Sequence, residues 1–242
     1  MILIGVDGLS HRFLEAHVQD LPFFRTMMKK NYNAIEIRED DALSAVMWNS
    51  VFAGIPPSQV PLRNYHIGDR MVKYDEIPFR KRYLWEKRKF TVISAPVVLP
   101  TYSNINLDLV NRGLTLERDE CEENMHRIFD AAMEHKDGDL IVCFTEIDRV
   151  EHFHWNKPEL LETYRLLDDL LKQLLEGYKG NFIIFSDHGF RDIPEEGGIL
   201  DASTGITGDH DPVQIFMGTK RVEYTTDLYW MVLQGDLDDP RA

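Results

Sequence analysis

The chain has 242 residues and a formal net charge of −14 at pH 7. This length is enough to bury one substantial core. Hydrophobic residues make up 43% of it and charged residues 28%, as in an ordinary globular domain, so we expect residues 1–242 to form a single domain. The acidic excess argues against a stable nucleic-acid complex, and no apolar stretch approaches the roughly 20 residues of a membrane span.

Short apolar runs alternate with helical patterns through the first half of the chain. Strands are expected at residues 1–6, 34–37 and 90–94, and helices at 21–30, 46–53 and 78–89. Pro22 stands near the start of the first helix, where its fixed φ is tolerated. Residues 65–118 carry fewer signals, and we expect them to hold a small cap or insert.

The second half continues this alternation. Helices are expected at residues 119–134 and 158–178, and strands at 140–144, 181–186 and 213–217. Strands that alternate with helices form βαβ units. The sequence therefore predicts an α/β fold, a three-layer sandwich with a mostly parallel central sheet.

Carboxylates and imidazoles follow the expected strands. Asp7 comes directly after the first strand, and Asp187 and His188 follow the strand at 181–186. In open α/β sheets, ligands bind outside the carboxyl ends of the strands. We therefore expect these three side chains to lie close together.

Two further segments add candidate ligands. Asp148 and His152 are four residues apart, so on a helix both would lie on one face. His210 lies in a loop rich in Gly and Asp. Each residue alone is ordinary, as a turn residue or an exposed histidine, but together the set suits two neighbouring divalent metals. The sequence thus predicts a two-metal hydrolase.

Several of these segments together resemble the alkaline phosphatase superfamily and, within it, the type I phosphodiesterase/nucleotide pyrophosphatase group. The segment 185–190, Phe-Ser-Asp-His-Gly-Phe, looks like the most specific signature of that group. The other resembling segments are residues 6–9, 44–57, 148–155, 210–212 and 225–233. The chain departs from the family at Val46, where Pro is frequent, and at residues 58–61, where a Gly-His pair is usual.

The resemblance implies roles for individual residues. Ser44 falls on the nucleophile, and Asn64 falls near a phosphate-contacting Asn. One metal would be held by Asp148, His152 and His210, and the other by Asp7, Asp187, His188 and the Ser44 oxygen. Zinc is the usual metal of the family, and the same donors also suit Mn or Fe.

The resemblance implies a phosphodiesterase or nucleotide pyrophosphatase that forms a covalent intermediate on Ser44. Its partner would be a phosphorylated small molecule, with nucleotides among the candidates. Because the chain is short for the family, we expect a reduced cap. The alternatives are a phosphomonoesterase or phosphomutase of the same superfamily, or a noncatalytic metal- or phosphate-binding member. The substrate and the oligomeric state stay open.

The two cysteines and the N-terminal residues indicate the cellular compartment that we expect for the protein. Cys121 and Cys143 have no metal-binding spacing and suggest no disulfide framework. Cys143 lies in the apolar run 140–144, so we expect it to be a buried thiol. The chain enters a strand-like run without a basic segment before it. On these grounds we expect a cytoplasmic protein.

Overall fold

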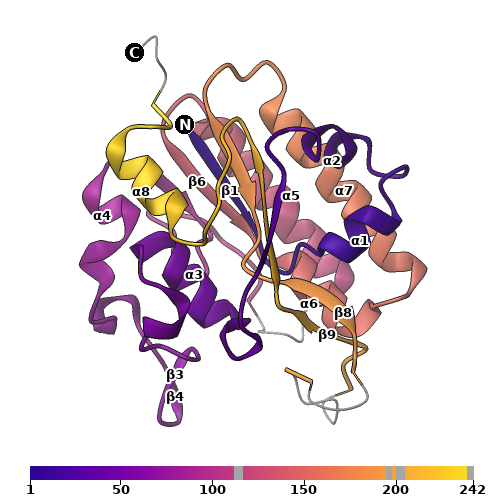
Figure 1. Ribbon diagram of the computed structural model, residues 1–242, viewed down its shortest axis with the longest axis horizontal. Coiled ribbons are helices and arrows are strands. Elements are labelled where there is room, and N and C mark those ends of the chain that lie inside the picture. The colour runs from indigo at the N-terminus through magenta and orange to yellow at the C-terminus, as the bar shows by residue number, and fades with distance from the viewer. Residues whose placement is uncertain (112–116, 195–197, 200–204, 239–242) are drawn as a thin grey trace.

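A central sheet lies between two layers of helices (Figure 1). The computed structural model describes residues 1–111, 117–194, 198–199 and 205–238. Six described strands form the main sheet in the order β2-β10-β7-β1-β6-β5. The predicted α/β sandwich is confirmed.

Most strands of this sheet run in the same direction. β1 (Ile2–Val6) pairs in parallel with β6 (Leu140–Phe144) and with β7 (Phe182–Phe185), and β6 pairs in parallel with β5 (Thr91–Ile93). β10 (Val213–Gly218) is antiparallel to β7 and to β2 (Asn33–Glu36). Only β10 is therefore reversed among these strands, which confirms the prediction of a mostly parallel sheet.

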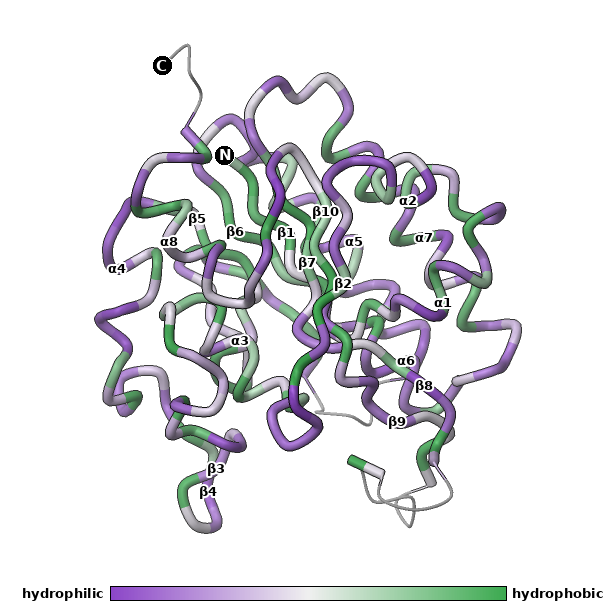
Figure 2. The backbone as a smooth tube through the Cα atoms, viewed as in Figure 1, coloured by the Kyte–Doolittle hydropathy of each residue, from purple (hydrophilic) through white to green (hydrophobic). Residues whose placement is uncertain are grey.

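One face of the sheet carries the longer helices. Ile2, Ile4 and Val6 point into this core, as the alternation of side chains along a strand requires. The helices of this layer are α1 (His11–Ala16), α2 (Pro22–Met27), α5 (Arg118–His135), α6 (Glu146–His154) and α7 (Pro158–Leu175). The strands at the centre are hydrophobic along their length, as Figure 2 shows, because both faces of the sheet are covered.

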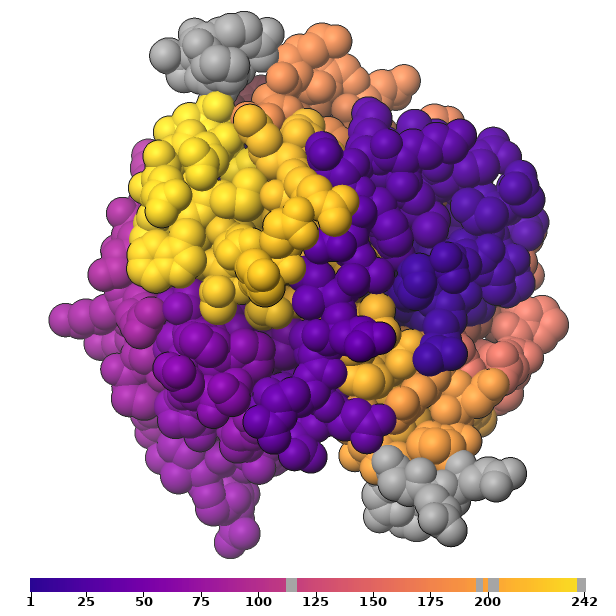
Figure 3. Space-filling view, viewed as in Figure 1, coloured from indigo at the N-terminus to yellow at the C-terminus, as the bar shows by residue number. Residues whose placement is uncertain are grey.

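The opposite face packs against α3 (Ser44–Ala53), α4 (Leu84–Lys87) and α8 (Asp227–Gln234). Leu3 points into this second core together with the fully buried Trp48. In Figure 3 the yellow α8 region lies beside the purple segment near residue 33. The Asn33 side-chain amide joins them by donating to the Val222 carbonyl at 2.8 Å.

Residues 65–118 are only partly separate from the sheet. β3 (His66–Ile67) and β4 (Arg70–Met71) form a small hairpin at the surface, whereas β5 is an edge strand of the main sheet. The chain also makes short 3-10 turns at Glu39–Asp41, Pro57–Gln59, Tyr74–Glu76 and Arg80–Arg82.

The predicted helix at 78–89 was wrong in extent. Tyr83 has φ −55° and ψ 146°, which interrupts the helix between the turn at Arg80–Arg82 and α4. Its side chain is fully buried, and its hydroxyl donates to the Asn49 side chain on α3. This tertiary contact outweighs the local helical preference.

Several described elements were not delimited from the sequence. They include α1, α6, the β3–β4 hairpin and the antiparallel hairpin of β8 (Gly189–Asp192) with β9 (Gly208–Asp211). Of these, α6 and the β8–β9 hairpin lie at the carboxyl ends of the central strands (Figure 1). None of the helices in the described ranges is long and apolar enough to cross a membrane.

Candidate active site

The predicted ligands converge at the carboxyl ends of β1, β6 and β7. Asp7 follows β1 directly, and Asp187 with His188 lies just past β7. Asp148 stands on α6, which begins soon after β6 ends. β8 and β9 pair so that His210 lies opposite Phe190. This pairing places His210 near the carboxyl ends of the same strands.

Ser44 is the first residue of α3 and is half-buried beside Asp7. Its Oγ lies 3.4 Å from Asp7 Oδ1 and 3.2 Å from His188 Nε2. The indole N–H of Trp48, one turn further along α3, donates to Asp7 Oδ2 at 3.2 Å. One helix therefore places the predicted nucleophile and also orients the carboxylate next to it.

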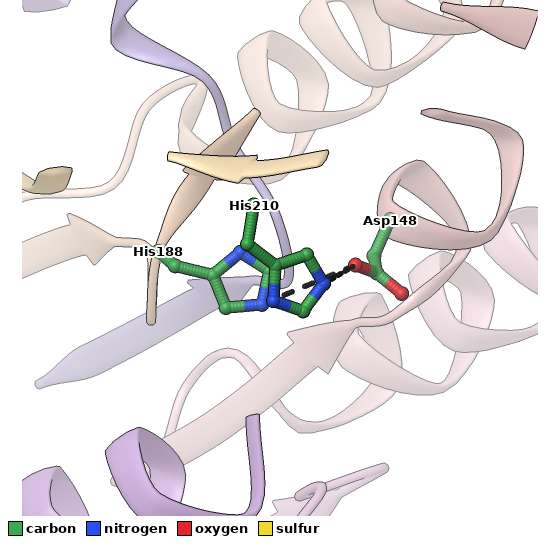
Figure 4. A group of neighbouring side chains, drawn as sticks. All are labelled: Asp148, His188 and His210. Carbon is green, nitrogen blue, oxygen red and sulfur yellow. Dashed lines mark ion pairs between the residues drawn. The ribbon is translucent and has the colours of Figure 1, made fainter. Parts of the chain in front are cut away.

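Asp148 lies within 4.0 Å of three histidines, of which Figure 4 draws His188 and His210. Its Oδ2 lies 3.3 Å from His152 Nε2, as expected for two residues one helical turn apart. Its Oδ1 lies 3.6 Å from His210 Nε2 and 4.0 Å from His188 Nε2. The His188 and His210 rings stack with their centroids 3.7 Å apart. Three segments thus meet at this carboxylate: α6, β9 and the connection between β7 and β8.

Two of the histidines have a defined tautomer. Nδ1 of His210 lies 2.9 Å from the Ala42 carbonyl, and Nδ1 of His188 lies 3.1 Å from the Gly189 carbonyl. A carbonyl only accepts, so Nδ1 carries the proton in both rings. Each Nε2 therefore offers its lone pair to the centre of the site, the arrangement that metal-binding histidines use.

Burial and neighbouring charges shift the pKa values of Asp7 and Asp148 in opposite directions. Burial raises the pKa of Asp7 well above its usual value, and the nearby Asp187 and Asp148 raise it further. Burial alone would also raise the Asp148 pKa, but His152 and His210 outweigh it and lower this pKa well below the usual value.

The histidines of the site also differ in pKa. Burial lowers the pKa of His188 to about 4, although Asp187 opposes the shift. Burial would lower the pKa of His210 too, but contact with Asp148 raises it. At neutral pH the His188 ring is therefore neutral and needs no deprotonation to act as a ligand.

The donor set fits bound metal. The side-chain atoms Asp148 Oδ1, Asp187 Oδ2 and His210 Nε2 are buried and have no hydrogen-bond partner among the described residues. Buried polar atoms are normally paired, so three unpaired donor atoms at one place fit a bound cation. Two sets have donor atoms within 4.8 Å of one another: Asp148, His188 and His210, and Asp7, Asp187 and His188.

These sets overlap with the ligand groups implied by the resemblance but do not coincide with them. His188 belongs to both compact sets, whereas His152 belongs to neither and reaches the site through its contact with Asp148. How the residues divide between two ions therefore stays a prediction.

A cavity of about 220 Å³ opens onto the site and shows which neighbours the sequence analysis missed. Its lining includes Asp7, Ser44, Asp148, His152 and His210, together with Tyr65, Pro96, Leu99, Thr145 and Arg149. Arg149 stood inside the matched 148–155 segment, and its charge next to Asp148 was a usable signal. Nothing in the local sequence marks the other four, because loops far apart in the chain bring them there.

The structure does not bring Asn64 into this cavity. Its side chain is exposed, and its Oδ1 accepts a hydrogen bond from the His66 backbone N–H at 2.9 Å. The neighbouring Tyr65 lines the cavity instead, with its hydroxyl donating to the Pro96 carbonyl at 2.6 Å. The role of Asn64 stays a prediction without support from this geometry.

Solved structures share this fold. Phosphonoacetate hydrolase from Sinorhizobium meliloti 1021, in complex with phosphonoformate, has a TM-score of 0.57 at 14% identity, over 79% of this chain and 56% of that one. This chain therefore corresponds to little more than half of that enzyme. Human ectonucleotide pyrophosphatase/phosphodiesterase 5 has a TM-score of 0.53 at 14% identity, over 97% of this chain and 94% of that one.

The murine form of the same protein, an inactive variant in complex with AMP, has a TM-score of 0.56 at 12% identity, over 98% of this chain and 94% of that one. No curated protein sequence matches the chain. A sequence profile for type I phosphodiesterase / nucleotide pyrophosphatase matches residues 37–205, which include Ser44 and the predicted ligands from Asp148 to His188. By this match over most of its length, the chain belongs to the type I phosphodiesterase / nucleotide pyrophosphatase family.

Proposed function

We propose that the chain is a metal-dependent phosphodiesterase or nucleotide pyrophosphatase that acts through Ser44. The observation that carries the proposal is the position of Ser44 Oγ, 3.4 Å from Asp7 Oδ1 and 3.2 Å from His188 Nε2, beside a buried cluster of unpaired ligand atoms. A hydroxyl in that place can be activated for attack on phosphorus.

Two divalent ions, zinc first and Mn or Fe as alternatives, would occupy the cluster. One would be held by Asp148, His152 and His210, and the other by Asp7, Asp187, His188 and the Ser44 oxygen. When bound, such ions lower the pKa of a hydroxyl and neutralise charge on a reacting phosphoryl group.

The residues of the chain position the reaction. The backbone N–H groups of Ser44 and Ala45 are the first of α3 and have no acceptor within the helix, so they favour a phosphate at that end. Trp48 holds the Asp7 carboxylate in place. Ser44 Oγ forms a bond to phosphorus as the leaving-group oxygen departs, and water then cleaves the phosphoseryl or nucleotidyl-seryl ester.

Small phosphorylated molecules suit this site best. The cavity of about 220 Å³ admits a phosphoryl group and part of its substituents but no polymer. The neighbouring structures were obtained with phosphonoformate and with AMP, which supports a phosphoryl-bearing ligand and keeps nucleotides among the candidates. The hairpin of β3 and β4 would form the reduced cap of a single domain.

Hydrolysis of bis-p-nitrophenyl phosphate and p-nitrophenyl phosphate tests the proposal. We expect Ser44→Ala to lower turnover of the diester by more than about 10³-fold while elemental analysis still finds metal. Ser58→Ala, an exposed serine on the same side of the sheet, is the matched control. Near-normal turnover by Ser44→Ala would contradict the covalent route.

The same assay separates the alternatives. A preference of the wild type for the monoester would identify a phosphomonoesterase. Bound metal without turnover of either ester would favour a noncatalytic member of the family. Absence of metal after incubation with zinc or manganese would overturn the metal site itself.

A further inference from the structure

Two cavities adjoin at the side chain of Arg149. The first is the cavity of about 220 Å³ over the predicted ligands, and the second has a volume of about 240 Å³. Thr145 and Arg149 line both. The guanidinium therefore borders both cavities.

The Arg149 side chain is held in place by hydrogen bonds that use only part of its N–H donors. Its Nη1 donates to Thr145 Oγ1 at 3.0 Å and to Glu146 Oε1 at 3.4 Å. Its Nε and Nη2 make no hydrogen bond to any side chain or backbone group within the described ranges. A guanidinium has five N–H donors in a planar fork, so most of them remain for a ligand.

The burial of Glu146 indicates that the Arg149–Glu146 ion pair costs free energy of folding. The residue is completely buried, and its Oε2 has no hydrogen-bond partner among the described residues. A buried ion pair contributes little to stability compared with well-packed apolar residues. Holding a cation at the rim of the site explains why the pair is present.

The second cavity is polar around this cation. Ser103, Asn106 and Asn124 line it, and the Asn124 amide is fixed by two bonds of 2.9 Å to the backbone of Val110. Among its described lining residues, Arg149 is the only cation, and the Glu146 carboxylate faces it as the only acid. The cavity thus suits a polar group that carries a negative charge.

The proposed division of ligands sets Arg149 away from the nucleophile. Ser44 and Asp7 belong with one ion, whereas Asp148, which directly precedes Arg149 on α6, belongs with the other. In an in-line displacement the leaving oxygen departs opposite the attacking Ser44 oxygen. A group attached to that oxygen then enters the second cavity.

We propose that Arg149 binds an anionic group, a carboxylate or a further phosphate, carried by the leaving group of the substrate. The inference rests on the proposed function and adds to it the class of leaving group. It makes Arg149 a specificity-determining residue, because guanidinium pairs with carboxylate or phosphate are charge-assisted and often bidentate.

The test compares leaving groups on a constant transferred group. ATP, which releases pyrophosphate, is compared with the p-nitrophenyl ester of AMP, and methyl 3-carboxyphenyl phosphate with methyl phenyl phosphate. For each pair we measure kcat/KM of the wild type, Arg149→Met and Arg149→Lys. Arg165→Met, which removes an exposed arginine that pairs with Asp20 on the surface, is the matched control.

We expect Arg149→Met to lower the ratio of charged to neutral ester by at least about tenfold, in the ATP pair if phosphate is bound and in the carboxyl pair if carboxylate is bound. Arg149→Lys should retain part of the wild-type preference for the charged ester, and Arg165→Met should retain all of it. An equal loss on both members of each pair would overturn the inference and leave the proposed function intact.

Two further outcomes are decisive. If the wild type cleaves none of the four esters, the proposed function and this inference both fail. If Arg149→Met does not fold because Glu146 loses its partner, the double variant Glu146→Gln/Arg149→Met removes the pair together, and an unchanged ratio in it would overturn the inference.

Discussion

At the scale of single residues, the site depends on side chains kept in unusual protonation states. His188 donates from Nδ1 to the Gly189 carbonyl and presents Nε2 to Ser44, Asp7 and Asp187. Burial lowers its pKa to about 4. The ring is therefore held neutral among carboxylates, ready to ligate.

This shift predicts a pH dependence in metal-free protein. Unfolded His188 titrates near 6.5, so the folded state resists protonation that the unfolded state accepts. The free energy of unfolding should therefore fall as pH drops from about 6.5 to about 4, by up to about 3 kcal/mol, with the full value above that window. Urea unfolding in EDTA at pH 7 and pH 5 measures it.

His188→Asn should show a smaller loss between these two pH values, because the shifted group is gone. His66→Asn, at an exposed position on β3, should behave as the wild type. An identical pH dependence in wild type and His188→Asn would show that the loss comes from other groups.

At the scale of elements, β1 and α3 fit together at a single glycine. A Cβ added to Gly5 would lie 2.6 Å from the Trp48 ring and 2.9 Å from Cys143 Sγ. The same Trp48 donates to Asp7 at the end of β1. Close approach of helix and strand thus sets the distance between Ser44 and its neighbours.

Gly5→Ala should force Trp48 to move. We expect the free energy of unfolding to fall by about 1–3 kcal/mol, as for other overpacked cores. We also expect diester turnover to fall, because Trp48 holds Asp7. Gly138→Ala, where the nearest atom to the new Cβ is 3.7 Å away, is the control. Unfolding curves that coincide for the two variants would contradict this account.

At the scale of the whole molecule, the predicted ligands come from distant parts of the chain. They follow strands β1 and β7 or lie on α6 and β9, so an ion bound there would connect the sheet, this helix and the β8–β9 hairpin. Three buried carboxylates, of Asp7, Asp148 and Asp187, also repel one another in its absence. Metal binding should therefore stabilise the folded state as a whole.

We expect zinc or manganese at about 100 times its Kd to raise the free energy of unfolding by about 2.7 kcal/mol, and so to raise the Tm by roughly 5–10 °C. Calorimetry with added metal and with EDTA measures the difference. His152→Ala should lose most of this rise. His154→Ala, on the same helix but outside the predicted ligands, should keep it. Equal rises in both variants would exclude His152 as a ligand.

The sequence predicted the periodic elements well because burial imposes their pattern. The strand at 140–144 was predicted with its observed ends, and the helix at 158–178 ends only three residues early, at Leu175. The break at Tyr83 was not predicted, because its cause is a contact with α3 that no local pattern encodes.

The site was predictable to a similar extent. Asp7, Asp187 and His188 were placed by the rule that ligands follow strands, and the structure brings them together. Tyr65 was missed as a cavity residue, since its place depends on loops that meet only in the folded chain, whereas Arg149 was missed although it directly follows Asp148 in the matched segment. Asn64 was carried over from a motif with altered spacing, and the structure leaves it at the surface.

The β8–β9 hairpin has a consequence for the life of the protein in a cell. On the ribosome Asp7 and Ser44 emerge long before His210, which β9 delivers to the site only after the hairpin has closed. A nascent or truncated chain that lacks this segment would carry the predicted nucleophile with an incomplete set of predicted ligands. Acquisition of metal would then wait for synthesis of β9, and proteolytic removal of the hairpin would abolish the proposed activity without touching Ser44.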